Sequence, residues 1–209
     1  LLCKVDAVDI ILTHQNADFD AIASMLAAWK LNPDAVPILP SRQQASVSQF
    51  LTLYQNGLPF VRWDDFVAYE PITHITLTDT QTMLDLPNLK PKTPMTIVDH
   101  HKIEREFAAH EIWAGAAIGA ATTLLVEQLE AKRMAISSLE ASLMALGIYA
   151  DTGMMTYGGT TARDIRATAW LLEQGAVLDT VQRFLSSPLN VQQQELLEVL
   201  LQQTQHRNI

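Results

Sequence analysis

Cysteine and basic residues are both scarce in this sequence. Cys3 is the only cysteine among 209 residues, so a disulfide framework and a thiolate zinc site are both excluded. The 14 Lys and Arg residues are outnumbered by 23 Asp and Glu, which gives a formal net charge of −9 and argues against a broad basic surface for duplex nucleic acid. A small local phosphate site stays open, and any metal must be held by carboxylates and imidazoles. We expect a protein of the reducing cytoplasm.

Long uncharged apolar runs are also missing. Lys4, Asp6 and Asp9 interrupt the N-terminal residues, which therefore lack the apolar core of a signal peptide. The most apolar later stretch, 113–126, contains glycines and threonines and stops at Glu127, short of the roughly 20 residues of a membrane-spanning helix. We therefore expect a soluble chain with no membrane partner.

Several nucleotide-binding and nucleophile motifs are absent as well. The pair Gly158-Gly159 lacks the spacing and the lysine of a P-loop, and a flexible turn is the better interpretation. No G-x-S-x-G elbow occurs, and no G-x-G-x-x-G follows the first apolar run. Neither a P-loop, nor a dinucleotide fingerprint, nor an esterase elbow supplies the chemistry.

Short apolar runs alternate with helical patterns in the first half of the chain. Strands are predicted at 8–13, 35–39, 71–78 and 95–98, and helices at 20–31 and 46–54. After His110 the pattern is helical, at 116–133, 138–149, 162–174, 177–185 and 191–205. Because parallel strands need crossovers, this order predicts an α/β fold: a parallel, Rossmann-like sheet with helices on both faces and a helical C-terminal part. Pro37 places strand 35–39 at an edge of the sheet.

Acidic and histidine side chains follow the predicted strands. They are His14, Asp18 and Asp20 after the first strand, Asp79 after the third, Asp99, His100 and His101 after the fourth, and Asp151 after the helix at 138–149. Ligands of open parallel sheets bind at the carboxyl ends of the strands, where these groups would meet. Five crowded aspartates repel one another, and divalent cations relieve the repulsion. Aspartate oxygen with histidine nitrogen suits manganese, with cobalt, iron, zinc and magnesium as competitors.

Each of these residues also has a simpler structural interpretation. Asp20 before an alanine-rich helix can be an N-cap, and Asp18 a loop residue in contact with solvent. Asp79 can belong to a strand-end turn, Asp151 to a helix C-terminal turn, and a single histidine is more often a satisfied polar residue than a ligand. The shared position at one edge of the sheet favours a joint site, in which two metals clamp a phosphoryl group.

The order and spacing of these motifs resemble the DHH phosphoesterase superfamily. The segments that carry the resemblance are 14–20 (HQNADFD) with Ser24, Thr78-Asp79-Thr80, Asp99-His100-His101, 150–153 (ADTG), and 160–164 leading into 171–176. Members include manganese-dependent pyrophosphatases, exopolyphosphatases, RecJ-type exonucleases, and phosphodiesterases of oligoribonucleotides and cyclic dinucleotides. Segment 13–31 also resembles the N-terminal region of bacterial chains that join a DHH domain to CBS domains and a tRNA nucleotidyltransferase (poly(A) polymerase) head.

The resemblance implies a division of the ligands between two ions. His14, Asp18 and Asp79 would hold one, and Asp20, Asp79, His100 and Asp151 the other, with Asp79 as the bridge. Mn²⁺ would be the metal, with Mg²⁺ or Co²⁺ as options. His101 would face the scissile phosphate, and Asp99 would orient the neighbouring histidine.

The resemblance also predicts further domains. Residues 1–190 would form the DHH domain and 191–209 a helix leading to a second, substrate-binding lobe, since nothing after Val191 resembles that lobe and the chain starts at Leu1 rather than Met. We expect a phosphorylated small molecule, single-stranded RNA or another oligonucleotide as substrate, and leave a homodimer open. A nucleotide- or RNA-binding module with weak or no hydrolysis is the alternative, and a purely structural domain is a third.

Overall fold

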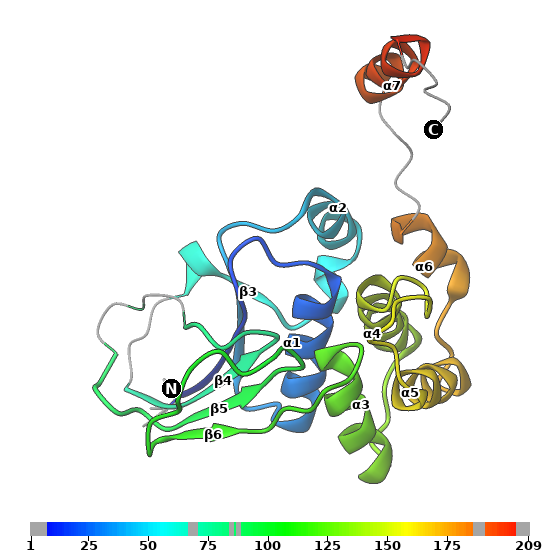
Figure 1. Ribbon diagram of the computed structural model, residues 1–209. Helices are drawn as coiled ribbons and strands as arrows, with labels where there is room; N and C mark the ends of the chain where they lie inside the picture. Colours follow the sequence, from blue (N-terminus) through cyan, green and yellow to red (C-terminus); the bar gives the residue numbers. More distant parts are fainter. Residues whose placement is uncertain (1–7, 67–70, 84–85, 87–88, 186–190, 204–209) are drawn as a thin grey trace.

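A single parallel sheet organises the chain. The computed structural model describes residues 8–66, 71–83, 86, 89–185 and 191–203. Its strands are β1 (Val8–Leu12), β2 (Val36–Leu39), β3 (Val61–Arg62), β4 (Ile72–Thr78), β5 (Met95–Val98) and β6 (Glu111–Trp113). All neighbouring strands pair in parallel, in the order β3-β2-β1-β4-β5-β6 (Figure 1). The predicted α/β class and parallel sheet are confirmed.

Helices make up the rest of the described secondary structure. They are α1 (Phe19–Leu31), α2 (Ala45–Tyr54), α3 (Ala121–Ala131), α4 (Ser138–Asp151), α5 (Ala162–Glu173), α6 (Leu178–Leu185) and α7 (Val191–Gln203), with the 3-10 helices η1 (Gln55–Gly57) and η2 (Trp63–Asp65). The predicted C-terminal helices are confirmed, but α3 begins at Ala121 rather than at 116. The reason is tertiary: the backbone N–H of Gly119 donates to the buried carboxylate of Asp164, and Ala120 is extended. No described helix is long and apolar enough to cross a membrane.

The two faces of the sheet are covered differently. From β1 the chain moves through β2 to β3, and then crosses back to β4, β5 and β6. Right-handed crossovers place these two sets of connections on opposite faces. The first set of connections contains α1 and α2, which lie on one face of the sheet. Helices α3 to α6 pack against these two helices and against one another on the same face (Figure 1). The other face packs against η2 and irregular segments, through Trp63, Phe66, Met83, Leu86 and Phe107. Among the described residues, α-helices therefore cover one face of the sheet. The sequence analysis had expected helices on both faces.

The edges of the sheet also differ from expectation. The two-residue strand β3 and the three-residue strand β6 form the edges, and neither was predicted, because so few residues make no apolar run. The placement of strand 35–39 at an edge is wrong, since β2 lies between β3 and β1. Pro37 is tolerated because the pairing with β3 begins at Ile38, one residue later.

Candidate metal centre

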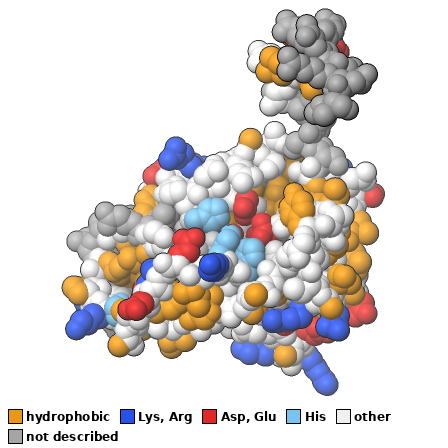
Figure 2. All heavy atoms as spheres, in the orientation of Figure 1, with side chains coloured by type: hydrophobic (Ala, Val, Ile, Leu, Met, Phe, Trp, Pro, Cys, Tyr) orange, Lys and Arg blue, Asp and Glu red, His pale blue; other side chains and the backbone are white. Residues whose placement is uncertain are grey.

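The predicted ligands meet where the order of the strands reverses. The chain leaves β1 towards β2 on one side, whereas β4 pairs with β1 on the other, so their connections separate at the carboxyl ends of these two strands. His14 follows β1, Asp79 follows β4 and Asp99 follows β5. Figure 2 shows acidic and histidine side chains gathered in the middle of this face of the molecule.

Asp79 lies at the centre of the cluster. Its side chain is 4% exposed, and its Oδ2 and Oδ1 lie 3.4 Å from Nε2 of His14 and 3.4 Å from Nε2 of His100 respectively. Its backbone φ of 56° is left-handed, and its N–H donates to the carbonyl of Val98 at 2.8 Å. Strained backbone of this kind concentrates at functional sites, and here it turns the carboxylate towards both histidines.

Both of these histidines are oriented by a backbone carbonyl. Nδ1 of His14 lies 2.8 Å from the carbonyl oxygen of Gln15, and Nδ1 of His100 lies 3.1 Å from that of Ile118. A carbonyl only accepts, so each Nδ1 carries the proton and donates it. In the neutral tautomer each Nε2 therefore presents its lone pair to the aspartates, which is how metal-binding histidines are usually held.

Two buried atoms at the centre have no hydrogen-bond partner. They are Oδ1 of Asp79 and Nε2 of His100. The His100 nitrogen also lies 3.0 Å from Oδ2 of Asp151 and 3.9 Å from Oδ2 of Asp20, and these contacts become ion pairs when the imidazole is protonated. Buried polar atoms without partners are costly and rare in native proteins. A cation between these oxygens and the nitrogen would satisfy both atoms.

Asp20 is fully buried and binds the start of another helix. Its Oδ2 accepts the backbone N–H of Ala121 at 2.6 Å, and its Oδ1 accepts that of Thr122 at 3.0 Å. It therefore caps α3, whose own N-cap residue, Ala120, has no side chain that could do so. The N-cap of α1 is Asp18, whose Oδ1 accepts the N–H of Ala21 at 3.0 Å.

The potential ligands fall into overlapping groups. One contains His14, Asp18 and Asp79, and another contains Asp20, His100 and Asp151; within each group, the ligand atoms lie within 4.8 Å of one another. A third group joins Asp79 and His100 to Asp99 and His101. The structure thus brings all eight predicted site residues together, whereas the role of each remains a prediction.

The pKa values show that the cluster strongly stabilises positive charge. Burial raises the pKa of Asp20 well above its usual range, and the nearby Asp79 adds to this. Asp79 itself keeps a lowered pKa, because its contacts with His100 and His14 outweigh burial. The bond to Asp79 raises the pKa of His14 to about 9. Burial opposes the same change in His100, but Asp151 and Asp79 raise its pKa to about 11. Protons on the two histidines are one source of this charge, and divalent cations are another.

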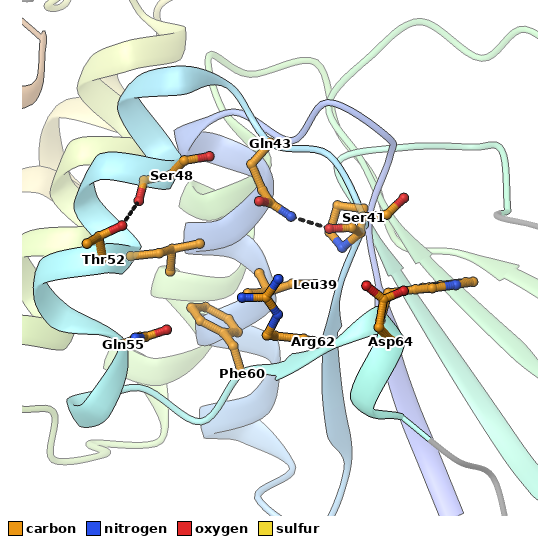
Figure 3. Close-up of a pocket in the computed structure, with 12 residues that line it drawn as sticks. Leu39, Ser41, Gln43, Ser48, Thr52, Gln55, Phe60, Arg62 and Asp64 are labelled. Carbon is orange, nitrogen blue, oxygen red and sulfur yellow. Dashed lines mark hydrogen bonds between the residues drawn. The ribbon is translucent and has the colours of Figure 1, made fainter.

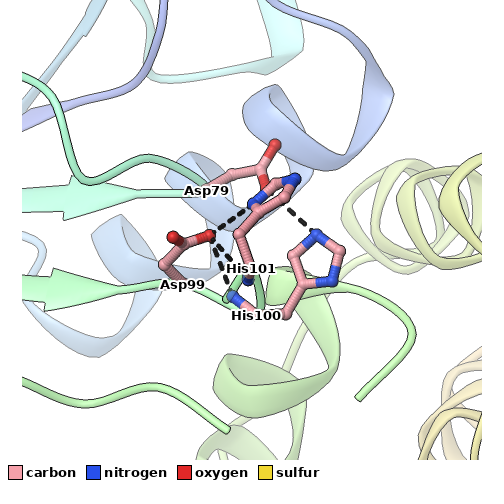
Figure 4. Close-up of side chains that lie close together, drawn as sticks. All are labelled: Asp79, Asp99, His100 and His101. Atoms are coloured by element: carbon pink, nitrogen blue, oxygen red, sulfur yellow. Dashed lines mark hydrogen bonds and ion pairs between the residues drawn. The ribbon is translucent and has the colours of Figure 1, made fainter. Parts of the chain in front are cut away.

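His101 is positioned differently from its neighbour (Figure 4). Its Nδ1 lies 2.7 Å from Oδ1 of Asp99, which also accepts the backbone N–H groups of His100 at 2.9 Å and of His101 at 3.3 Å. Asp99 therefore clamps the start of this loop. The bond to Asp99 raises the pKa of His101, whose side chain is 59% exposed beside the buried Asp79. This imidazole can reach a ligand in solution, whereas His100 faces the interior.

Comparison with known families identifies the chain. Residues 10–148 match the model of the DHH family, N-terminal domain, a range that includes the segments 14–20, 78–80 and 99–101. The chain belongs to the DHH family. Among curated proteins, this DHH domain is 37% identical over 200 residues to an A-adding tRNA nucleotidyltransferase of Geobacter sulfurreducens, covering 93% of this chain but 23% of that protein. The chain therefore spans less than a quarter of the length of that relative.

Two further comparisons extend the relationship. The DHH domain is 25% identical over 178 residues to a Streptococcus agalactiae protein assigned as a manganese-dependent inorganic pyrophosphatase, covering 80% of this chain and 56% of that one. Its fold matches the crystal structure of an exopolyphosphatase-related protein from Bacteroides fragilis with a TM-score of 0.69, at 19% identity, over 96% of this chain and 62% of that one. The structural match to the Bacteroides fragilis protein establishes the fold.

Gln81 is a residue of the DHH site that the sequence analysis missed. Its Nε2 donates to Oδ2 of Asp99 at 2.9 Å and to the carbonyl of Lys102, while its Oε1 accepts the N–H of Glu104. It thereby ties the loop after β4 to the loop after β5. Its position two residues after Asp79 was the feature of the sequence that could have indicated a role in the site. The hollow beside it is about 330 Å³ in volume and is also lined by Thr80, Thr82 and Glu104.

Proposed function

We propose that this DHH domain is a metal-dependent phosphoesterase that holds two divalent cations. The observation that carries the proposal is a pair of buried atoms that form no hydrogen bond, Oδ1 of Asp79 and Nε2 of His100, 3.4 Å apart. Both are metal-binding atoms, and both face further carboxylates. The assignment of the Streptococcus agalactiae relative as manganese-dependent supports Mn²⁺ over Mg²⁺ or Co²⁺.

The ligand groups support a division between two ions. His14, Asp18 and Asp79 would hold one ion through Nε2 and carboxylate oxygens, and Asp20, His100 and Asp151 would hold the other. Asp79 has one oxygen near each histidine, which suits a bridging carboxylate. Asp20 has a second role in this arrangement, because its bonds to α3 fix the position of its oxygens.

The remaining residues would position the substrate. When bound, two divalent cations lower the pKa of a water and neutralise phosphate oxygens. His101 would donate a hydrogen bond or a proton to the leaving oxygen, because it is exposed and borders the hollow. Asp99 would hold its ring through Nδ1, leaving Nε2 for the substrate.

The substrate class is a phosphodiester or phosphoanhydride, of the oligoribonucleotide, cyclic dinucleotide or polyphosphate type. Pyrophosphatase and exopolyphosphatase-related proteins among the relatives support phosphoryl chemistry in general. The alternative is a nucleotide- or RNA-binding module with little hydrolysis, within a longer tRNA nucleotidyltransferase that carries CBS domains. The A-adding relative favours this second candidate.

Hydrolysis with and without metal tests the proposal. We expect the purified chain to release product from pyrophosphate or a dinucleotide when Mn²⁺ is added, and Asp79→Asn to remove most of this activity. Asp34→Asn is the matched control, since Asp34 is exposed and lies just before β2, at the amino ends of the strands rather than at their carboxyl ends. Binding of an oligonucleotide without any Mn²⁺-dependent product would favour the binding module instead.

A further inference from the structure

A second pocket lies beside α2 (Figure 3). Its volume is about 290 Å³, and it is enclosed by α2 on one side and by the ends of β2 and β3 on the other. The face of α2 that borders it carries Ser48, Leu51 and Thr52, at the spacing of one helical face, and Gln55 follows at the start of η1. Three of these four side chains are polar, so this face of α2 suits a polar ligand.

The lining combines an apolar floor with convergent polar groups. Leu39, Leu51, Phe60 and Trp63 supply the apolar and aromatic surface. Arg62 reaches into the middle of the pocket, between the hydroxyls of α2 and Ser41 (Figure 3). Its guanidinium forms no ion pair with a described residue, and the protein as a whole is strongly acidic. Polar and charged side chains, Asp64 among them, outnumber the apolar ones in the lining, so the pocket suits a ligand with both polar and apolar parts.

The pocket and the metal centre share one loop. Ala17, which lies between His14 and Asp18, forms a β-bridge with Gln43, which lines the pocket. Its N–H donates to the carbonyl of Arg42 at 3.3 Å, and its carbonyl accepts the N–H of Gln44 at 2.9 Å. The hydroxyl of Ser41, in the pocket, also lies 3.4 Å from Oε1 of Gln15. Segment 14–18 therefore has the metal centre on one side and the pocket on the other.

We propose that this pocket binds one nucleotide unit of a single-stranded oligonucleotide whose neighbouring phosphate lies at the metal centre. The inference rests on the proposed function and narrows its substrate class. Pyrophosphate and polyphosphate have no apolar part and gain nothing from Phe60 and Trp63, whereas a base stacks on aromatic rings. Arg62 suits the phosphate of the same unit, since guanidinium binds phosphate through paired hydrogen bonds.

Two pocket variants and one control test the proposal. Thr52→Trp fills the pocket from an exposed position of α2, and Arg62→Gln removes its cation. Gln49→Trp places the same bulk on α2 at an exposed position that does not line the pocket. The probe is a fluorescein-labelled triadenylate with phosphorothioate links, which resist hydrolysis. Its affinity is measured by fluorescence anisotropy with Mn²⁺.

We expect each pocket variant to weaken binding of the probe about tenfold, the range of one stacked base or one phosphate contact. Gln49→Trp should bind the probe as the parent does and should hydrolyse pyrophosphate at the parent rate. A parent that does not bind the probe, or pocket variants that bind it undiminished, would overturn the proposal. Probe binding that depends on the pocket, without hydrolysis of any phosphate compound, would overturn the proposed function instead. If Thr52→Trp fails to fold, Arg62→Gln still decides.

Discussion

Asp20 receives opposite influences from its neighbours. The N–H groups at the start of α3 favour its charged form, because a helix N-terminus stabilises an anion. Burial and the neighbouring Asp79 and Asp151 disfavour that form and raise its pKa. A divalent cation relieves this conflict, since its double positive charge offsets most of the charge of the three carboxylates while α3 stays capped. The same residue thus serves the fold and the candidate metal centre.

Substitutions of the adjacent residues His100 and His101 should have different effects. His100→Ala removes the buried Nε2 and should weaken metal binding, whereas His101→Ala should spare metal binding and remove most of the hydrolysis, because His101 is exposed and held by Asp99. Calorimetric titration with Mn²⁺ and a hydrolysis assay on both variants measure this. Equal loss of metal in the two variants would show that their roles have been divided incorrectly.

Without metal, the protein should lose stability as the pH rises. The folded state holds the proton of His14 more tightly than the unfolded chain does, with a pKa of about 9 against 6.5. This contribution is complete below pH 6.5 and disappears as the pH passes through about 9, and the raised pKa of Asp20 acts in the same direction. In EDTA, urea titrations should show the free energy of unfolding falling by about 1 to 3 kcal/mol over this interval.

Mn²⁺ should remove this decline, because a metal binds the deprotonated histidine. His14→Gln is the control and should show a smaller decline in EDTA. A rise in stability from pH 6.5 to 9 in EDTA would contradict the assignment.

Among the elements, α1 and α4 pack unusually closely at one glycine. A Cβ on Gly147 would lie 2.6 Å from Cβ of Ala23 and 3.0 Å from the carbonyl oxygen of Phe19. Gly147→Ala should therefore destabilise the protein by about 1 to 3 kcal/mol through overpacking, although alanine in a helix normally gains up to about 1 kcal/mol. Urea denaturation measures the change. Adding Ala23→Gly should restore part of the stability, and a variant as stable as the parent would refute the close contact.

The elements that could be predicted are those with a repeated local signal. The strands β1, β2, β4 and β5 are apolar runs, and α4 begins at a capping box of Ser137 and Glu140. Tertiary partners decide the rest: β6 has three residues, and the start of α3 depends on Asp20 and Asp164. The sequence also did not predict that irregular segments cover the second face of the sheet. Which segment lies on which face depends on the side to which each connection between strands crosses.

The candidate site was more predictable than the fold around it. Strand ends converge in any parallel sheet, so Asp79 and Asp99 had to lie close together once β4 and β5 were recognised. The different exposure of His100 and His101 comes from the structure, as does the link from Gln81 to Asp99. These details depend on side-chain bonds between loops, which local patterns do not encode.

Across the whole molecule, the centre joins the sheet to the helical layer. Asp79 and His100 follow β4 and β5, Asp20 belongs to α1 and binds α3, and Asp151 ends α4. A cation held by these groups would connect five elements that come together only in the folded chain. Metal binding should therefore stabilise the entire described domain rather than a single loop.

Mn²⁺ should accordingly raise the melting temperature in a concentration-dependent manner. A ligand that binds the folded state alone contributes about 2.7 kcal/mol at a hundred times its Kd, and for a domain of this size that corresponds to about 5 to 10 °C. Thermal denaturation at increasing Mn²⁺ measures the shift, with NaCl of equal ionic strength as the control for general screening. Asp151→Asn should reduce the shift and Asp79→Asn should nearly abolish it, because Asp79 contacts both histidines. An equal shift in the parent and in Asp79→Asn would place the bound ion elsewhere, since an ion that does not contact Asp79 gains nothing from its carboxylate.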